Sequence, residues 1–377
     1  MMNARYRFLR GLSPFFGACA VLPGNPASAQ GPGGMPLNFG AAADMVFSAP
    51  TRDLEESEFD VRAFEINIGA PVDPYFDFLA TLAWEDDEAE LEEAWVSTVL
   101  PWNLKLKFGR EFLPFGNLNP IHEHDYPQVN APSVHEAFTS DGAMIGDGAH
   151  LEYLAPYLNP TLTLIVGVYD EVHGSVGRRI DGFPLLARAQ SFYQSPLGEH
   201  ALMAGASFLT SAGSRDPMED RLDADGFTSD DRARGKLDYL FGLDLKYKYS
   251  PGITTYQGLV LGAEYLYASY DAYKNHADFT PGLQVDADSG FYVYAEWNFD
   301  RFRGVGYRYD RTDVLFSSLE GGAGMEGHTL YKQWRPTEFS RLRLQYQFAD
   351  NDLEDETEHT VMLQATFFIG WHPPHRF

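Results

Sequence analysis

Apolar and polar residues alternate with a period of two along most of the chain, and the stretch from Lys236 to Tyr249 shows this pattern clearly. Its odd positions, from Leu237 to Tyr249, are all apolar or aromatic, and its even positions include charged residues: Asp238, Asp244, Lys246 and Lys248. This alternation predicts a β-strand with one apolar face and one polar face. At about fourteen residues, the predicted strand is longer than is usual in soluble sheets.

About sixteen segments carry this pattern, and no helical segment between them could cover an apolar sheet face. The predicted strands are 36–48, 60–69, 75–85, 88–98, 103–113, 144–154, 161–170, 184–194, 201–211, 236–249, 256–268, 289–299, 302–312, 326–334, 338–348 and 359–371. We therefore predict an all-β fold, a transmembrane antiparallel β-barrel with lipid outside and water inside. A secreted sandwich or β-helix is the alternative. Rows of aromatic residues on the exposed face, such as Phe76, Phe78 and Trp84, argue against it.

The connections between the predicted strands alternate between tight and long. Tight turns rich in proline occur at 71–74, 157–160 and 250–252, whereas acidic stretches such as 216–234 and 269–286 are long. Bacterial outer-membrane barrels have short periplasmic turns and longer external loops. The alternation thus predicts that both chain termini lie in the periplasm.

The first 29 residues resemble a secretory signal: three arginines precede a short apolar stretch, and Ala27-Ser28-Ala29 fits a cleavage site. A lipoprotein signal ending at Cys19 is the alternative reading. We expect residues 1–29 to be the signal peptide and 30–377 to form one barrel domain. The predicted cleavage removes the only cysteine.

Composition narrows the function. The formal net charge is −26, which disfavours nucleic acid as a partner. No run of 18 apolar residues occurs that would form a membrane-spanning helix. No nucleophile with a base at a recognisable spacing, glycine-rich phosphate loop or paired-cysteine motif occurs, so we expect no enzymatic activity.

Several motifs resemble a known family. The final hairpin alternates strictly, and the chain ends on Phe377, which is similar to the assembly signal of outer-membrane proteins, although Pro373-Pro374 interrupt it. The stretches 92–96, 106–110 and 115–119 (EEAWV, LKFGR and FGNLN) resemble the porin superfamily, including phosphate-selective porin-like proteins and porin-like proteins labelled zinc-regulated TonB-dependent outer-membrane receptors. A true TonB-dependent transporter needs about 22 strands and a plug. This chain is too short for both.

The resemblance implies an outer-membrane porin of a Gram-negative bacterium that gives passive, selective diffusion of small hydrophilic solutes or ions. Acidic external loops predict a cation preference. We expect this preference to be weak, because loop charges far from the pore are screened within about 8 Å. The alternative function is an uptake barrel or receptor that responds to divalent metal, zinc above all, without a plug domain. The expected partners are outer-membrane lipid, the outer-membrane assembly machinery, the transported solutes and two further copies in a homotrimer.

The resemblance also implies that the stretch 114–142 folds into the barrel and narrows it. The candidate constriction residues are His122, Glu123, His124, Asp125, His135, Glu136 and Asp141. In an extended segment, His122 and His124 lie on one face and are candidate ligands for a transient Zn²⁺ ion, with Asp125, His135 or Glu136 folding back toward them. We expect no resident cofactor. A hydrated polar loop is the simpler reading.

Polar strand positions predict the wall of the lumen. The candidate lumen-lining residues are Lys105, Lys107, Glu111, His150, Glu152, Asp244, Lys246, Lys248, Glu264, Glu296, Arg308, Asp310, Arg341 and Arg343. Most of the basic ones lie near tight turns, and several acidic ones lie nearer the long loops. A basic ladder facing acidic loop groups would produce a transverse field that selects solutes by charge. Alternatively, these residues are simply hydrated wall.

Overall fold

A computed structural model describes residues 29–30, 36–51, 57–85, 88–139, 143–174, 176, 180, 182–212, 236–252, 256–271, 285–313, 324–352 and 356–371. The predicted signal peptide up to Ser28, Asp141, most of the acidic stretches 216–234 and 269–286, and the C-terminal Phe377 lie outside these residues. In the described part of the chain, no helix is long and apolar enough to cross a membrane.

Sixteen antiparallel strands form a closed barrel, because the last strand pairs with the first long one. The strands are β2 (Pro36–Pro50), β3 (Glu58–Pro71), β4 (Phe76–Glu85), β5 (Glu88–Leu100), β6 (Leu104–Phe112), β7 (Ile145–Ala155), β8 (Thr161–Val172), β9 (Phe183–Gln194), β10 (His200–Ala212), β11 (Lys236–Tyr249), β12 (Gly258–Asp271), β13 (Val285–Asn298), β14 (Arg303–Asp313), β15 (Gly324–Thr337), β16 (Ser340–Asn351) and β17 (Glu356–Gly370). A two-residue strand, β1 (Ala29–Gln30), pairs with β2. The predicted barrel and its strand number are confirmed.

The two faces of the wall differ in the way expected of a barrel in lipid. Apolar side chains are exposed on the outside, for example Val166 at 57%, Leu243 at 46% and Leu330 at 59%. Charged side chains on the inside are almost fully buried, among them Arg188 and Glu264. Exposed apolar rows and buried polar rows reverse the arrangement of a soluble protein.

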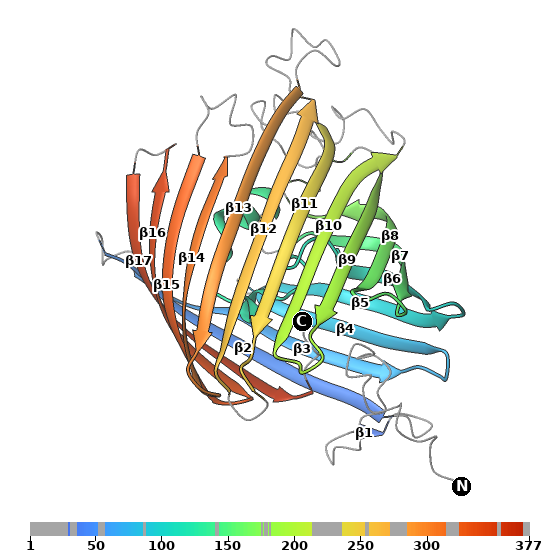
Figure 1. Cartoon of the computed structure of the whole chain (residues 1–377), viewed down its shortest axis with the longest axis horizontal. Coiled ribbons are helices and arrows are strands. Elements are labelled where there is room, and N and C mark those ends of the chain that lie inside the picture. Colours follow the sequence, from blue (N-terminus) through green and yellow to red (C-terminus); the bar gives the residue numbers. More distant parts are fainter. Residues whose placement is uncertain are drawn as a thin grey trace.

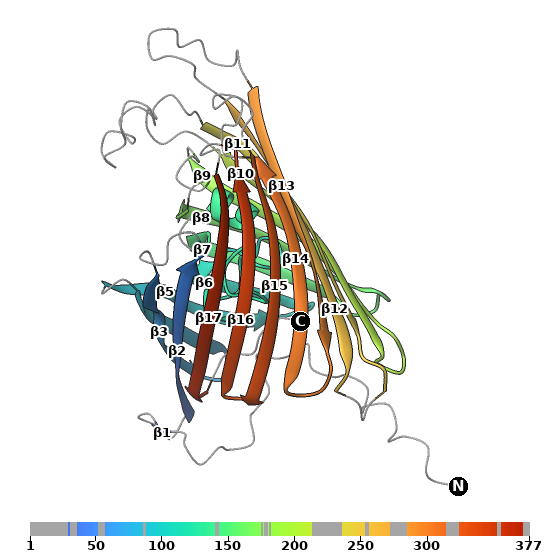
Figure 2. The same cartoon turned by 90° about the vertical axis from the view of Figure 1, so that its left-hand side faces the viewer.

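The strands tilt around the barrel, and the tight turns from β9 to β10, from β13 to β14 and from β15 to β16 lie at its lower end in Figure 1. Figure 2 shows the same barrel from the side on which β17 meets β2. Two connections depart from the predicted alternation, because only residues 86–87 join β4 to β5 and only residues 352–355 join β16 to β17. The long connection between β6 and β7 contains a 3-10 turn, η2 (Glu123–Asp125), and a short helix, α1 (Ser133–Thr139).

Candidate functional site

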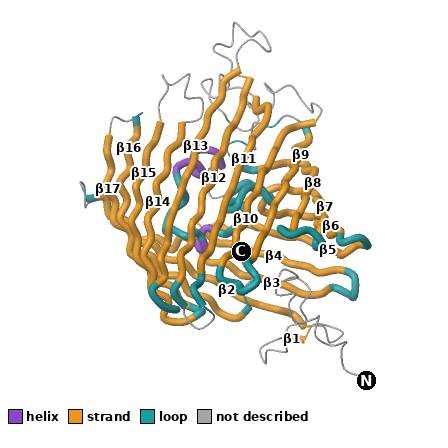
Figure 3. The backbone as a smooth tube through the Cα atoms, viewed as in Figure 1, coloured by secondary structure: helices purple, strands orange, loops and turns teal. Residues whose placement is uncertain are grey.

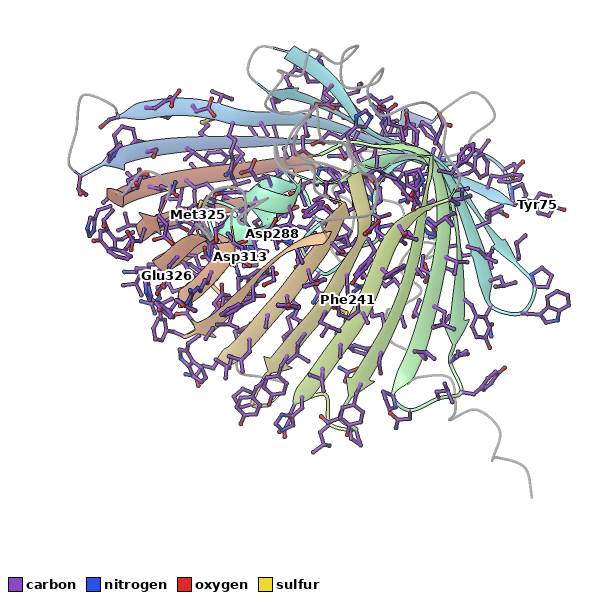
Figure 4. All side chains as sticks on the ribbon, turned by 90° about the horizontal axis from the view of Figure 1, so that it is seen from above. Tyr75, Phe241, Asp288, Asp313, Met325 and Glu326 are labelled. Atoms are coloured by element: carbon purple, nitrogen blue, oxygen red, sulfur yellow. The ribbon has the colours of Figure 1, made fainter. Side chains whose placement is uncertain are left out.

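The described residues 113–139 and 143–144, which we call the inner loop, fold into the barrel between β6 and β7. The helical segments of this loop lie within the ring of strands in Figure 3, and the view from above in Figure 4 shows α1 inside that ring. Asn119 closes the base of the loop: its Nδ2 donates to the carbonyl oxygens of Leu113 (2.9 Å) and Met144 (3.0 Å), and its Oδ1 accepts from Met144 N (2.6 Å). The two ends of the loop are thereby joined.

One side of the inner loop packs against the wall through apolar side chains. Phe115, Leu118, Val134 and Phe138 of the loop are at most 3% exposed. They belong to one buried cluster with residues of the facing strands, including Ile165, Tyr169, Leu186, Leu209, Leu240, Leu266, Tyr270 and Tyr292. Burying several large side chains stabilises the folded loop by about 1.5–3 kcal/mol for each. The loop is thus a packed part of the barrel interior.

Glu264 on β12 anchors the same side of the loop. Its carboxylate accepts hydrogen bonds from Asn117 N (3.2 Å) and Tyr292 Oη (3.1 Å), and it lies 3.1 Å from His135 Nε2. Gly116 approaches this carboxylate so closely that an added Cβ would lie 1.6 Å from Oε1. Gly116 also has a φ of +63°, a conformation that favours glycine.

Four arginines hold the opposite side of the loop through its backbone carbonyl oxygens. Arg341 donates to His124 O, Arg343 to Tyr126 O and Gln128 O (2.6 Å), Arg62 to Val129 O, and Arg308 to Asn130 O (2.8 Å). A loop without sheet partners needs donors for its buried carbonyl groups, and guanidinium supplies several N–H groups in a fixed geometry. The predicted basic residues Arg308, Arg341 and Arg343 therefore fix the loop in place.

His122 lies in a pocket of glutamates where the loop meets β3 and β5. Its Nδ1 is 3.5 Å from Glu65 Oε2 and 3.2 Å from Glu92 Oε2, and its Nε2 is 3.4 Å from Glu93 Oε2. Burial disfavours the charged imidazolium, but the Glu65 and Glu92 carboxylates outweigh this effect and raise the pKa of His122 well above its usual value.

His124 lies beside His122, with ring centroids 5.6 Å apart. Its Nδ1 is 2.6 Å from Glu65 Oε1, and its Nε2 is 3.0 Å from Asp125 Oδ2. Burial opposes protonation, but these two carboxylates raise the pKa of His124 to about 9. Both ring nitrogens thus face carboxylates. Three side chains are spaced for a metal ion here, Glu65, Glu92 and His122, and His124 is not among them.

The other predicted residues fall into separate groups. Glu111 lies 2.6 Å from His150 Nδ1 and 2.7 Å from Lys107 Nζ. Asp244 pairs with Arg188 (2.6 Å), and Arg308 with Asp310 (2.7 Å). The remaining pair, Lys105 and Glu152, are cross-strand partners on β6 and β7.

His135 and Glu136 do not join the His122 pocket. They lie on α1, where His135 faces Glu264 and Glu136 is exposed. Glu123 pairs with Arg62 at 2.9 Å. Among the described candidates of the loop, His135 lies at the Glu264 anchor, Glu123 pairs with Arg62 and Glu136 is exposed, so only His122, His124 and Asp125 lie together.

A cavity of about 150 Å³ remains beside the inner loop. Its charged lining consists of Lys246, Lys248, Arg335, Arg341 and Arg343 against Asp125 and Glu296. Five cationic groups and two carboxylates give it a formal charge of +3. The lining also includes Tyr126 and Tyr294, so the space is polar, positively charged and bounded on one side by the loop.

Several residues of the site were missed from the sequence, chiefly Glu65, Glu92, Glu93, Arg62 and Arg188. A signal existed for two of them, because Glu92 and Glu93 break the alternation of their strand. The structure explains this break: the pairing shifts from Thr81–Glu93 to Leu82–Leu91, which leaves Glu92 as the extra residue of a β-bulge. For the other three, the partner lies too far along the chain for local pattern to reveal it.

No protein-family model matches the sequence. An uncharacterized protein of Aquifex aeolicus is 28% identical over 343 residues, which cover 86% of this chain and 71% of that protein. Among solved structures, OmpF of Salmonella typhi in complex with daunomycin matches with a TM-score of 0.58 and 13% identity, covering 89% of this chain and 98% of OmpF.

Two further solved structures match similarly. The outer-membrane channel DcaP of Acinetobacter baumannii has a TM-score of 0.57 and 10% identity, over 91% of this chain and 100% of DcaP. The anion-selective porin of Comamonas acidovorans has a TM-score of 0.56 and 10% identity, over 88% and 99%. The chain therefore has the fold of the sixteen-stranded outer-membrane porins. The sequence-based resemblance to this superfamily is confirmed at the level of the fold.

Proposed function

We propose that this protein is an outer-membrane channel for passive diffusion of small hydrophilic solutes, with the inner loop setting its narrowest part. The observation that carries the proposal is the charged cavity between the loop and strands β11, β12, β13, β15 and β16. A barrel with an apolar outer face and a polar interior is suited to lipid outside and aqueous solutes inside. The cavity is the place where a solute would meet charges at close range.

The sign of the cavity charge favours small anions. The sequence predicts a weak cation preference from the acidic external loops, most of which lie outside the described residues. Charges at a constriction act on every solute that passes, whereas loop charges more than about 8 Å away are screened at physiological salt. We therefore propose that the +3 lining outweighs the loops and gives the channel an anion preference.

Swelling of liposomes that contain the refolded protein tests this proposal. We expect the liposomes to swell in solutions of small neutral sugars, and to swell faster with a small organic anion than with a cation of equal size. Swelling no faster than that of protein-free liposomes would refute a diffusion channel. Faster entry of the cation would refute the anion preference alone.

A homotrimer is the proposed assembly. One solved structure with the same fold, OmpT of Vibrio cholerae, is described as a trimer form. Chemical cross-linking in native outer membranes should then yield a species three times the monomer mass. Recovery of monomers alone would count against the trimer.

The alternative function, a barrel that responds to divalent metal, has one observation in its favour: the spacing of His122, Glu65 and Glu92. In the structure, this response would act on the same channel, because His122 belongs to the loop that bounds the cavity. Addition of micromolar zinc should change the conductance. An unchanged conductance would refute the metal response and leave the channel function intact.

A further inference from the structure

Three potential ligand atoms lie at ion-pair distance from the His122 ring nitrogen or belong to it, but make no hydrogen bond, where the inner loop meets the wall. Glu65 Oε2, Glu92 Oε2 and His122 Nδ1 are all buried and unsatisfied. Each of the three residues offers one ligand atom within 4.8 Å of those of the other two, and the Glu65 side chain is only 3% exposed. Leaving buried polar atoms unsatisfied costs about 1–3 kcal/mol each, so such a group calls for an explanation.

The spacing of these atoms suits a cation held between them. Zinc ligands lie about 2.0–2.2 Å from the metal, so neighbouring ligands in a tetrahedral site are separated by about 3.3–3.6 Å. The Nδ1 of His122 is 3.5 Å from Glu65 Oε2 and 3.2 Å from Glu92 Oε2. Both distances match or nearly match the edge of such a tetrahedron.

Two neighbouring side chains, His124 and Glu93, orient the candidate ligands, as the hydrogen-bond partners of ligands do in known metal sites. His124 Nδ1 lies 2.6 Å from Glu65 Oε1, which leaves Oε2 directed at His122. Glu93 Oε2 lies 3.4 Å from His122 Nε2, so Nε2 can keep its proton toward Glu93 while a metal ion replaces the proton on Nδ1. Histidine ligands commonly donate their second N–H to a carboxylate in this way.

The backbone of β5 also brings Glu92 and Glu93 to the same side of the wall. Glu92 is the extra residue of the bulge in β5, and a bulge re-aims side chains. Without it, the neighbours Glu92 and Glu93 would point to opposite faces of the wall. With it, both approach the same imidazole, Glu92 on one ring nitrogen and Glu93 on the other.

We propose that Glu65, Glu92 and His122 bind a divalent transition-metal ion of the Zn²⁺ class, which ties the inner loop to β3 and β5. One imidazole and two carboxylates form a donor set for zinc and its neighbours, whereas Ca²⁺ and Mg²⁺ prefer oxygen ligands alone. Two carboxylates also balance the charge of the ion. This inference adds to the proposed channel and does not depend on conduction.

Isothermal titration of ZnCl₂ into the refolded full chain in detergent, after treatment with EDTA, tests the inference. We expect one Zn²⁺ to bind per chain, and both Glu92→Gln and His122→Gln to weaken binding by about tenfold or more. His150→Gln is the matched control, because His150 is also a buried histidine beside a glutamate, Glu111 at 2.6 Å. This control should bind zinc as the wild type does.

Three results would overturn the site: no zinc binding by the wild-type chain, equal binding by both site variants, or a loss in His150→Gln as large as in the site variants. Calcium bound as tightly as zinc would overturn the assigned class of ion. Each variant is first checked for the folded barrel by its mobility in unheated detergent gels. If His122→Gln does not fold, Glu92→Gln, whose side chain is 13% exposed, decides the outcome, and liposome swelling independently reports the channel.

Discussion

Reversing the charge of Lys246 and Lys248 should reverse the ion preference of the channel. Both lysines line the cavity beside the inner loop, which has a formal charge of +3. Replacing both by glutamate changes that charge by four units, to −1. The variant Lys246→Glu/Lys248→Glu therefore converts a basic cavity into a weakly acidic one without changing the loop.

The size of the effect follows from Coulomb's law. A unit charge about 7 Å from a passing ion contributes about 0.6 kcal/mol in water. Screening by physiological salt reduces this to about 0.25 kcal/mol. Four units then amount to about 1 kcal/mol, which changes the local concentration of each ion about fivefold, in opposite directions for anions and cations.

The assay is the reversal potential of a planar bilayer in a salt gradient. We expect the wild type to show an anion-directed potential and the double variant a cation-directed one. Lys105→Glu is the control, since Lys105 is a lumen-facing lysine of β6 that does not line the cavity. If the double variant keeps the wild-type potential, or if Lys105→Glu shifts it equally, the cavity is not the selective part of the ion path.

Three further predictions concern the inner loop and the cavity. Gly116→Ala should lower the free energy of unfolding by about 1–3 kcal/mol, because the new Cβ would collide with the Glu264 carboxylate and φ at this position is positive. A denaturant titration measures this loss, and an unchanged midpoint would refute the close contact between Gly116 and Glu264. Arg343→Met should leave the carbonyl oxygens of Tyr126 and Gln128 without this donor, so a protease should cut the inner loop faster than in the wild type. An unchanged rate of cleavage would show that Arg343 is not needed to hold the loop. Lys248→Cys should make the conductance sensitive to a bulky thiol reagent added to either side of the bilayer, whereas the wild-type chain without residues 1–29, which include its cysteine, should be insensitive. A Lys248→Cys conductance that the reagent leaves unchanged would show that the ion path does not pass Lys248.

The barrel could be predicted from the sequence because its determinants are local. Period-two alternation defines each strand, and the strand predicted at 236–249 has the same bounds as β11. The outer face could be predicted for the same reason, since every second residue of a strand faces lipid. The connections from β4 to β5 and from β16 to β17 are shorter than the alternation of tight and long connections implied.

The inner loop could be predicted only in part. Its histidines and acidic residues suggested a polar constriction, but Phe115, Leu118, Val134 and Phe138 show that much of it is an apolar core. These apolar residues were a visible signal, because a hydrated loop has no need of them. Their partners on the wall could not be inferred.

The anchors on the opposite side depend on contacts between distant parts of the chain. His124 meets Glu65 and Arg341, which are 59 and 217 residues away in the sequence. Closure of the barrel brings such positions together, and no local pattern encodes which lumen residue will face which loop residue. The break in alternation at Glu92 was the one feature of the local sequence that pointed to the His122 pocket. The β-bulge in β5 is the physical cause of this break.

Single-channel conductance of the refolded wild-type protein in a planar bilayer tests the central claim most directly. The claim is that the cavity beside the inner loop forms part of an open, positively charged path through the barrel. We predict discrete, stable current steps and an anion-directed reversal potential in a salt gradient. A folded barrel that inserts but carries no current would contradict the claim, because it would show that the packed inner loop closes the lumen.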